Sequence, residues 1–148
     1  MKINLGSSDG TVSRYIQAKK EQVPRLMRTF GMEFYRQVTI STPVDTGRAR
    51  YGWNCSVGNP DFIIPAKAPE GTGVSSGGGV FYTLDSGKAG RVFTQSAVTG
   101  ESPIYISNAV NYITALNNGH SRQAPARFVE LSFFNVVDKL FKLTLHNQ

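Results

Sequence analysis

The chain has 148 residues, of which 40% are hydrophobic, and it carries a formal net charge of +6. A chain of this size is expected to form one domain, residues 1–148, whose core needs no disulfide or metal to hold it together. Its apolar runs are all shorter than the roughly 20 residues of a transmembrane helix, and its first residues lack the apolar segment of a secretory signal. We therefore expect synthesis in the cytoplasm and no membrane partner.

Basic residues concentrate in the first third of the chain. Residues 1–50 contain nine Lys or Arg and four Asp or Glu, so this third carries +5 of the total +6. Such a region suits contact with nucleic acid or with an acidic protein surface, but it is also typical of a solvated helix face. The composition favours the solvated face and leaves the other two interpretations open.

Apolar residues recur every three or four positions from residue 12 to residue 38, which predicts a helical region. Pro24 interrupts this pattern, because proline removes a backbone donor and is best tolerated at the first position of a helix. We therefore predict two helices, at about 11–21 and 24–41.

The pattern changes abruptly at the turn that follows, residues 43–47. Pro43 disfavours a helical conformation at the residue before it, Asp45 can accept a hydrogen bond from a backbone N–H two residues on, and Gly47 can adopt a positive φ. Asp45 is thus better explained as a turn residue than as a general base. Apolar and polar residues then alternate, which predicts a strand at about 48–57 with one buried and one solvated face.

The two faces of this predicted strand differ in character. Trp53 and Cys55 belong to the buried face, and Cys55, the only cysteine, is interpreted as a small core residue. Arg48 and Arg50 belong to the solvated face. We interpret these two arginines as candidate contacts with another subunit or partner; a solvated pair is the alternative.

The segment from about residue 61 to residue 102 has little regular pattern and is interpreted as an inserted flexible loop with a hairpin. Two short apolar runs, at about 80–84 and 91–94, flank a stretch of turn residues and predict the hairpin. Its residues Phe81 and Tyr82 are candidates for contact with a neighbouring subunit.

The next stretch is predicted to contain a strand at about 102–107 and then a short helix. Asn108 is expected to cap this helix, at about 109–118, and Gly119 to end it. Neither histidine belongs to a pattern of metal ligands, and no Gly-x-Ser-x-Gly turn is present. The sequence therefore predicts no catalytic site, metal or cofactor.

The last helix is expected at about 126–143, with Pro125 at its start. Its apolar residues cover more than one face, and Phe133 and Phe134 lie beyond the stripe that would pack on a sheet. A helix of this kind usually contacts more than its own domain, so these two phenylalanines are candidate interface residues. The predicted fold is α+β: about four mostly antiparallel strands packed by the N-terminal helical region, the short helix and the last helix.

Two stretches of the chain carry a resemblance to one protein family. The first is Thr42-Pro-Val-Asp-Thr-Gly-Arg48, followed by Arg50 and Trp53; the second is Ile106-Ser-Asn108, Tyr112 and Leu116-Asn-Asn-Gly119-His-Ser121-Arg-Gln-Ala-Pro125. These stretches resemble the signature of tailed-bacteriophage neck proteins, which are called tail-completion, head–tail joining or minor tail proteins and are related to tail terminators. The resemblance covers most of the chain apart from about 61–102.

The resemblance implies a structural protein of the virion and no enzymatic activity. It implies a homo-oligomeric ring, a hexamer or a dodecamer, between a head-completion protein on the portal side and a tail-tube or tail-terminator protein, with genomic DNA passing through without sequence-specific contact. It also implies that the motif residues hold the domain together; these are Pro43, Asp45, Gly47, Trp53, Asn108, Gly119 and Pro125.

A basic nucleic-acid-binding module is the alternative function. It rests on the excess of Lys and Arg in the first third, although the chain contains no known nucleic-acid-binding motif. The two functions predict different behaviour, because binding to nucleic acid weakens steeply as salt rises, whereas apolar contacts between subunits do not.

Overall fold

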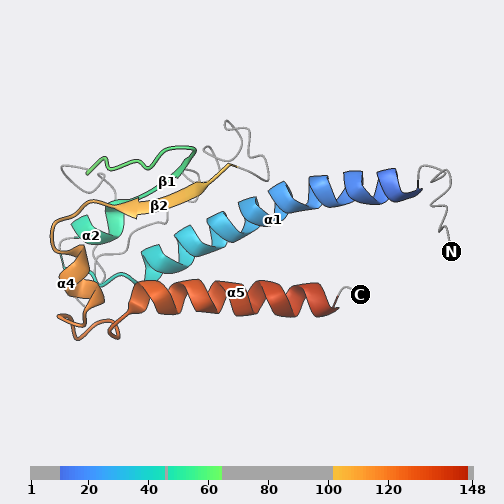
Figure 1. Ribbon diagram of the computed structural model, residues 1–148. Helices are drawn as coiled ribbons and strands as arrows, with labels where there is room; N and C mark the ends of the chain where they lie inside the picture. Colours follow the sequence, from blue (N-terminus) through green and yellow to red (C-terminus); the bar gives the residue numbers. More distant parts are fainter. Residues whose placement is uncertain (1–10, 46, 65–101, 147–148) are drawn as a thin grey trace, which may run out of the picture.

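The computed structural model describes residues 11–45, 47–64 and 102–146. These residues form an antiparallel pair of strands beside two long helices (Figure 1), which confirms the mixed α+β class. The hairpin predicted at 80–94 lies outside the described residues. The elements in chain order are α1 (Thr11–Ser41), α2 (Arg48–Tyr51), β1 (Trp53–Val57), β2 (Ile104–Asn108), α4 (Ile113–Asn117) and α5 (Phe128–His146).

The N-terminal helical region is one continuous helix of 31 residues with Pro24 in its interior. The prediction of two helices separated at Pro24 is therefore wrong. Proline removes the N–H that would bond to the carbonyl four residues earlier, but Lys20 is exposed, so water can reach that carbonyl. The predicted end of the helix, at about residue 41, is confirmed, since α1 stops at Ser41, two residues before Pro43.

Helices α1 and α5 lie side by side and run in opposite directions below the strands (Figure 1). Their apolar stripes meet the strands in one core, in which Val38 and Phe128 are almost completely buried. Trp53 and Cys55 reach the same core from β1, as their alternation predicted. None of the described helices has both the length and the apolar character needed to cross a membrane.

The strand predicted at 48–57 begins later, because Arg48–Tyr51 form the short helix α2 and β1 covers Trp53–Val57. A single helical turn and a strand both bury Ala49, so the alternation of apolar residues did not separate the two. Gly52 joins them at a place with no room for a side chain: a Cβ there would lie 2.7 Å from Cγ2 of Val110. Consequently Arg48 and Arg50 do not lie on a strand face.

The second face of β1, predicted to be solvated, is covered by the chain that follows the strand. Asn54 is only 1% exposed, and its Nδ2 donates to the carbonyl of Ile63 at 2.7 Å. On the neighbouring strand, the Ser107 hydroxyl donates to the carbonyl of Asp61. The backbone of this covering segment thus replaces water as the hydrogen-bonding partner of the polar face.

Strand β2 pairs antiparallel with β1, with Trp53 opposite Asn108 and Val57 opposite Ile104. The predicted cap at Asn108 is wrong, because Asn108 is the last residue of β2, and α4 begins five residues later without a side-chain cap. The Asn108 side chain instead donates to the carbonyl of Ala49 at 2.7 Å and accepts from the N–H of Val110 at 3.0 Å. It therefore joins β2 to α2.

The last two helices differ in length from the prediction. Helix α4 is limited to Ile113–Asn117, and Gly119 follows it with the positive φ, 91°, expected of a residue that ends a helix. Helix α5 covers Phe128–His146 and so begins two residues later than predicted, three residues after Pro125.

Candidate functional site

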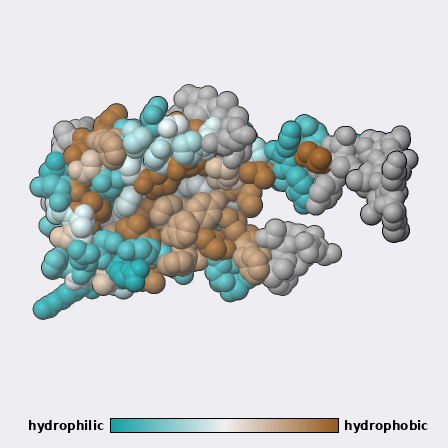
Figure 2. Space-filling view, viewed as in Figure 1, coloured by the Kyte–Doolittle hydropathy of each residue, from teal (hydrophilic) through white to brown (hydrophobic). Residues whose placement is uncertain are grey.

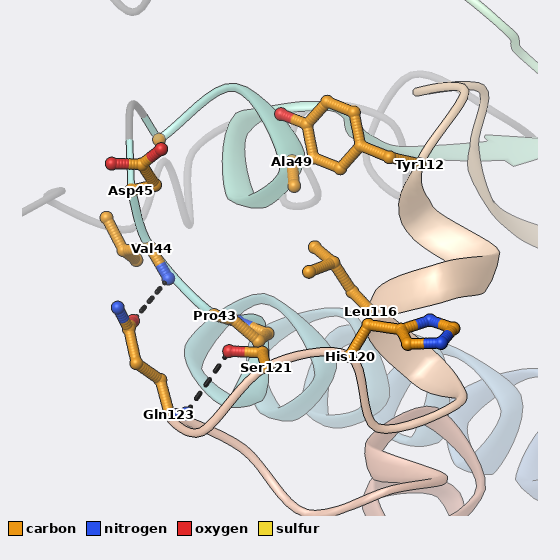
Figure 3. A pocket seen from close by; sticks show the side chains of 10 residues that line it. Pro43, Val44, Asp45, Ala49, Tyr112, Leu116, His120, Ser121 and Gln123 are labelled. Atoms are coloured by element: carbon orange, nitrogen blue, oxygen red, sulfur yellow. Dashed lines mark hydrogen bonds between the residues drawn. The ribbon is translucent and has the colours of Figure 1, made fainter.

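The two stretches that carry the family resemblance meet at one end of the molecule, beside the end of α1. The indole Nε1 of Trp53 donates to Oγ1 of Thr42 at 2.8 Å, within the first stretch. The N–H of Val44 donates to Oε1 of Gln123 at 2.9 Å, which joins the first stretch to the second (Figure 3). Residues 79 positions apart in the sequence are therefore bonded directly.

Arg50 holds the C-terminal end of α1. Its Nη2 donates to the carbonyls of Ile40 at 2.9 Å and Thr42 at 2.8 Å, and its Nε also donates to Thr42 at 3.2 Å. The last carbonyls of a helix lack partners within the helix, and a cation there also interacts favourably with the helix dipole. Arg48 is exposed. A contact of either arginine with a partner protein stays a prediction.

A cavity of about 410 Å³ lies between the two stretches (Figure 3). Its polar groups hold the loops that form it, since Gln123 Oε1 accepts from Val44 and Ser121 Oγ accepts from the N–H of Gln123 at 3.1 Å. Asp45 and His120 lie on opposite sides of the cavity and, with Ser121, do not form a catalytic triad. Gly47 has the predicted positive φ, 82°. The described residues contain no group of three or more His, Cys, Asp or Glu that is placed to hold a metal ion.

Asn117 joins α4 to the first turn of α5, a contact that the sequence did not reveal. Its Oδ1 accepts from the N–H of Val129 at 3.0 Å, and its Nδ2 donates to the Glu130 carboxylate at 2.9 Å. The hydrogen bond from Asn117 and the nearby Arg127 guanidinium lower the pKa of Glu130. No local pattern marks this role, because Asn117 caps a helix that begins eleven residues later.

A broad apolar surface runs along the outer side of α1 and α5 (Figure 2). Phe133 packs edge-on against Phe30, with ring centroids 5.3 Å apart, and also against Phe34 and Phe134. Phe134 and Phe141 are nevertheless 62% and 63% exposed, which confirms the predicted wide apolar surface of the last helix. We call this surface the helix-side patch and define it by its exposed apolar residues: Leu26, Phe133, Phe134, Val137 and Phe141.

The helix-side patch contains a groove of about 480 Å³. Met27 and Ile104 lie at its base and are partly buried against the core. Leu26 of α1 and Phe141 of α5 also line it. The complete lining is Leu26, Met27, Phe30, Ile104, Val137, Leu140 and Phe141.

One ion pair crosses between the two helices beside this patch. Lys139 of α5 donates to the carboxylate of Glu33 on α1 at 2.8 Å, and Arg36 lies 3.4 Å from the same oxygen. The hydrogen bond from Lys139 is the main cause of the lowered pKa of Glu33, and the charges of Lys139 and Arg36 add to it. The patch is thus bordered by fixed charges on one side.

A second, smaller apolar surface lies on the segment that covers the polar face of β1. Phe62 and Ile63 are 61% and 69% exposed, and Ile64 is 37% exposed. We call these three residues the loop-side patch. The proposed contact residues Phe81 and Tyr82 lie outside the described part of the chain.

The N-terminal end of α1 extends beyond the end of α5 (Figure 1). Between residues 14 and 28 it exposes five basic residues, Arg14, Lys19, Lys20, Arg25 and Arg28, and one acidic residue, Glu21. The basic excess predicted for the first third of the chain is therefore concentrated on one exposed helix.

Comparisons of the chain with protein-family models, curated proteins and solved structures found no match.

Proposed function

We propose that this chain is a structural protein of a tailed-bacteriophage virion, with no enzymatic activity, and that identical copies form a ring at the neck. The ring completes the tail or joins it to the head, and genomic DNA passes through it. The main support for the proposal is that hydrogen bonds join the two stretches that carry the resemblance. Gln123 accepts from the N–H of Val44, and Asn108 donates to the carbonyl of Ala49. The residues that carry the resemblance are thus joined in one structural unit.

The exposed apolar surface supports a protein that functions by assembly. Its three exposed phenylalanines alone present roughly 300 Å² of apolar surface, since a phenylalanine side chain offers about 200 Å². The largest apolar patch on a typical soluble monomer is about 300–600 Å² and is often functional, and the whole helix-side patch, at roughly 400 Å², is within this range. Burial of this surface between subunits supplies the energy of assembly, and surface charge orients the partners.

The ring would contact a head-completion protein on the portal side and a tail-tube or tail-terminator protein on the other side. Contact with DNA would involve backbone phosphates and the exposed arginines and lysines of α1, and it would carry no sequence information. These assignments rest on the family resemblance, and the exposed basic residues of α1 support the last of them.

The experiment that tests the proposal is the native mass of the purified protein, measured by light scattering at low and high salt. We expect a mass of six or twelve times the 16.2 kDa of one chain, and we expect it to persist at high salt because apolar contacts are not screened. If the protein is a monomer, sedimentation with purified tails and with purified DNA-filled heads decides the question, and binding to neither contradicts the proposal.

A basic nucleic-acid-binding module is the second candidate, because α1 exposes five basic residues between residues 14 and 28. This function requires a monomer or small oligomer whose affinity for DNA falls steeply as salt rises. A salt titration of binding to a fluorescent duplex separates the two functions. Binding that disappears between 50 and 200 mM salt, by a protein with no affinity for tails or heads, would replace the ring with this module.

A further inference from the structure

We infer that neighbouring subunits join head to tail, with the loop-side patch of one copy seated in the groove of the helix-side patch of the next. This inference rests on the proposed ring, and it specifies the contact that closes the ring. The occupant of the groove is therefore a second copy of this chain, and the seated residues are Phe62, Ile63 and Ile64.

The two patches lie on opposite sides of the pair of strands. Cys55 and Ile106 point toward the helices, whereas Asn54 and Ser107, one position away on each strand, hold the segment that carries the loop-side patch. A subunit with two unlike patches on opposite sides can repeat the same contact from copy to copy, which generates a ring when the rotation closes. A ring between two different partners needs this arrangement, because a contact related by a twofold axis would make its two sides identical.

The backbone of the loop-side patch is held in place while its side chains remain exposed. The carbonyl of Ile63 accepts from buried Asn54 at 2.7 Å, and the N–H of Ile63 donates to Oδ1 of Asp61 at 2.9 Å. Ser107 fixes the carbonyl of Asp61 from the other strand. A rigid segment that presents three apolar side chains loses little conformational entropy when it binds, which favours association.

The groove has the size and chemistry for these side chains. A cavity of about 150 Å³ is enough to hold a benzene ring, so the groove of about 480 Å³ admits about three groups of that size. Every residue that lines it is apolar, including Leu26 of α1 and Phe141 of α5. One phenyl and two branched aliphatic side chains match this space.

The area of the two patches is that of a specific interface. The exposed parts of the loop-side patch amount to roughly 250 Å² of apolar surface, and those of the helix-side patch to roughly 400 Å². Because interfaces between proteins are about 60% apolar, complete burial of both patches, with Phe133 and Phe134 covered beside the groove, would correspond to a total buried surface of about 1,100 Å². This value exceeds the about 1,000 Å² that separates specific contacts from incidental ones, although it is at the low end of stable interfaces.

Cysteine cross-linking of the full chain tests the contact directly. The natural Cys55 is buried, so cysteines introduced at exposed positions react selectively. The double variant Ile63→Cys/Phe141→Cys, oxidised under mild conditions, should give a ladder of covalent multimers that ends at the size of the ring. Each single variant, Ile63→Cys or Phe141→Cys, should stay a single chain, because the same residue from two copies does not meet.

The other outcomes overturn the inference in ways that leave the proposed ring distinguishable. A covalent dimer from Phe141→Cys alone would show that two helix-side patches face each other. The double variant could give no ladder although its native mass is that of six or twelve chains. The proposed ring would then stand, and the contact inferred here would be wrong. If the double variant gives no ladder, does not assemble and binds neither tails nor heads, both the inferred contact and the proposed ring are wrong.

Charged variants supply a second measurement that does not depend on cross-linking. Ile63→Glu should weaken self-association at least about tenfold, because a carboxylate in the groove would be desolvated without a partner. Ile40→Glu is the matched control, since Ile40 is exposed on α1 and belongs to neither patch. The monomers of the wild type, Ile63→Glu and Ile40→Glu should unfold at the same urea concentration. Equal weakening by both variants, or by neither, contradicts the inference.

Discussion

The two ends of the pair formed by α1 and α5 differ in how far their side chains are buried and hydrogen-bonded. At the end where α1 stops, Trp53, Thr42 and Arg50 are bonded to each other or to the helix carbonyls, and the core residues Val38 and Phe128 are buried. Toward the other end, Leu26 and Phe141 are more than half exposed. The first region therefore determines the stability of the fold, and the second offers surface for a partner. Substitutions in the two regions should affect different measurements.

The largest effect should come from Trp53→Ala, which removes a buried ring and leaves the Thr42 hydroxyl without the indole donor. We expect a loss of about 3–5 kcal/mol in the free energy of unfolding, which is a large part of the total for a small domain. Phe141→Ala is the matched control; its ring is mainly exposed, so the monomer should change by about 0.5 kcal/mol or less. Urea unfolding monitored by circular dichroism measures both. Equal losses would remove the distinction between the two ends.

Arg50→Met should have the next largest effect, because it leaves the last carbonyls of α1 without their cationic donor. We expect a loss of about 1–2 kcal/mol in the same unfolding experiment. Arg48→Met tests the neighbouring exposed arginine and should change stability by about 0.5 kcal/mol or less. If Arg48→Met proved the more damaging of the two, the capping role of Arg50 would be wrong.

Asn117→Ala should destabilise the start of α5 by about 1 kcal/mol, the usual loss when a helix cap is removed. The exposed neighbour Asn118 provides the control variant, Asn118→Ala. An NMR titration gives an independent measurement: the pKa of Glu130 should rise toward its ordinary value in Asn117→Ala, since the hydrogen bond from Asn117 is the main cause of its lowering. An unchanged Glu130 pKa would contradict the contact.

The smallest effect should come from Lys139→Met, which removes the ion pair between α1 and α5. At neutral pH we expect a loss below about 1 kcal/mol, because both partners are partly exposed. Glu33 has a lowered pKa in the folded protein, so the pair stabilises the fold above the ordinary carboxyl pKa of 4.5, and this contribution disappears as the pH falls through the lowered value.

The control for Lys139→Met is Lys142→Met, because Lys142 pairs with Asp138 within α5. Its effect should not report on the contact between the helices. Unfolding curves of the wild type and Lys139→Met should therefore differ at pH 7 and converge well below pH 4.5. A difference that grows on acidification would contradict the assigned role of Glu33.

The sequence predicted those features that depend on periodicity or on a local turn. The burial of Cys55 and Trp53, the stop at Gly119 and the wide apolar face of α5 all follow from spacing or from backbone preference. The prediction failed for Pro24, where a local preference was overridden by the continuous helix.

Contacts between distant residues were not predictable from one sequence. Asn54 was expected in water, because nothing local shows that the chain near Ile63 returns to accept its hydrogen bond. Arg50 was expected on a strand, because the end of α1 enters its environment only in the folded protein. In the candidate site, the exposure of Phe133 and Phe134 was predicted from their spacing, whereas the groove required the relative positions of α1, β2 and α5.

The proline inside α1 has a consequence for the dynamics of this helix. At Pro24 one backbone hydrogen bond of the helix is missing, and the N-terminal end of α1 projects beyond α5 (Figure 1). Amide protons between residues 14 and 22 can therefore exchange with solvent by opening of this arm alone, whereas those between residues 30 and 40 are released only when the core unfolds. A helix that is continuous in its geometry thus divides, in hydrogen exchange, into a fast half and a slow half.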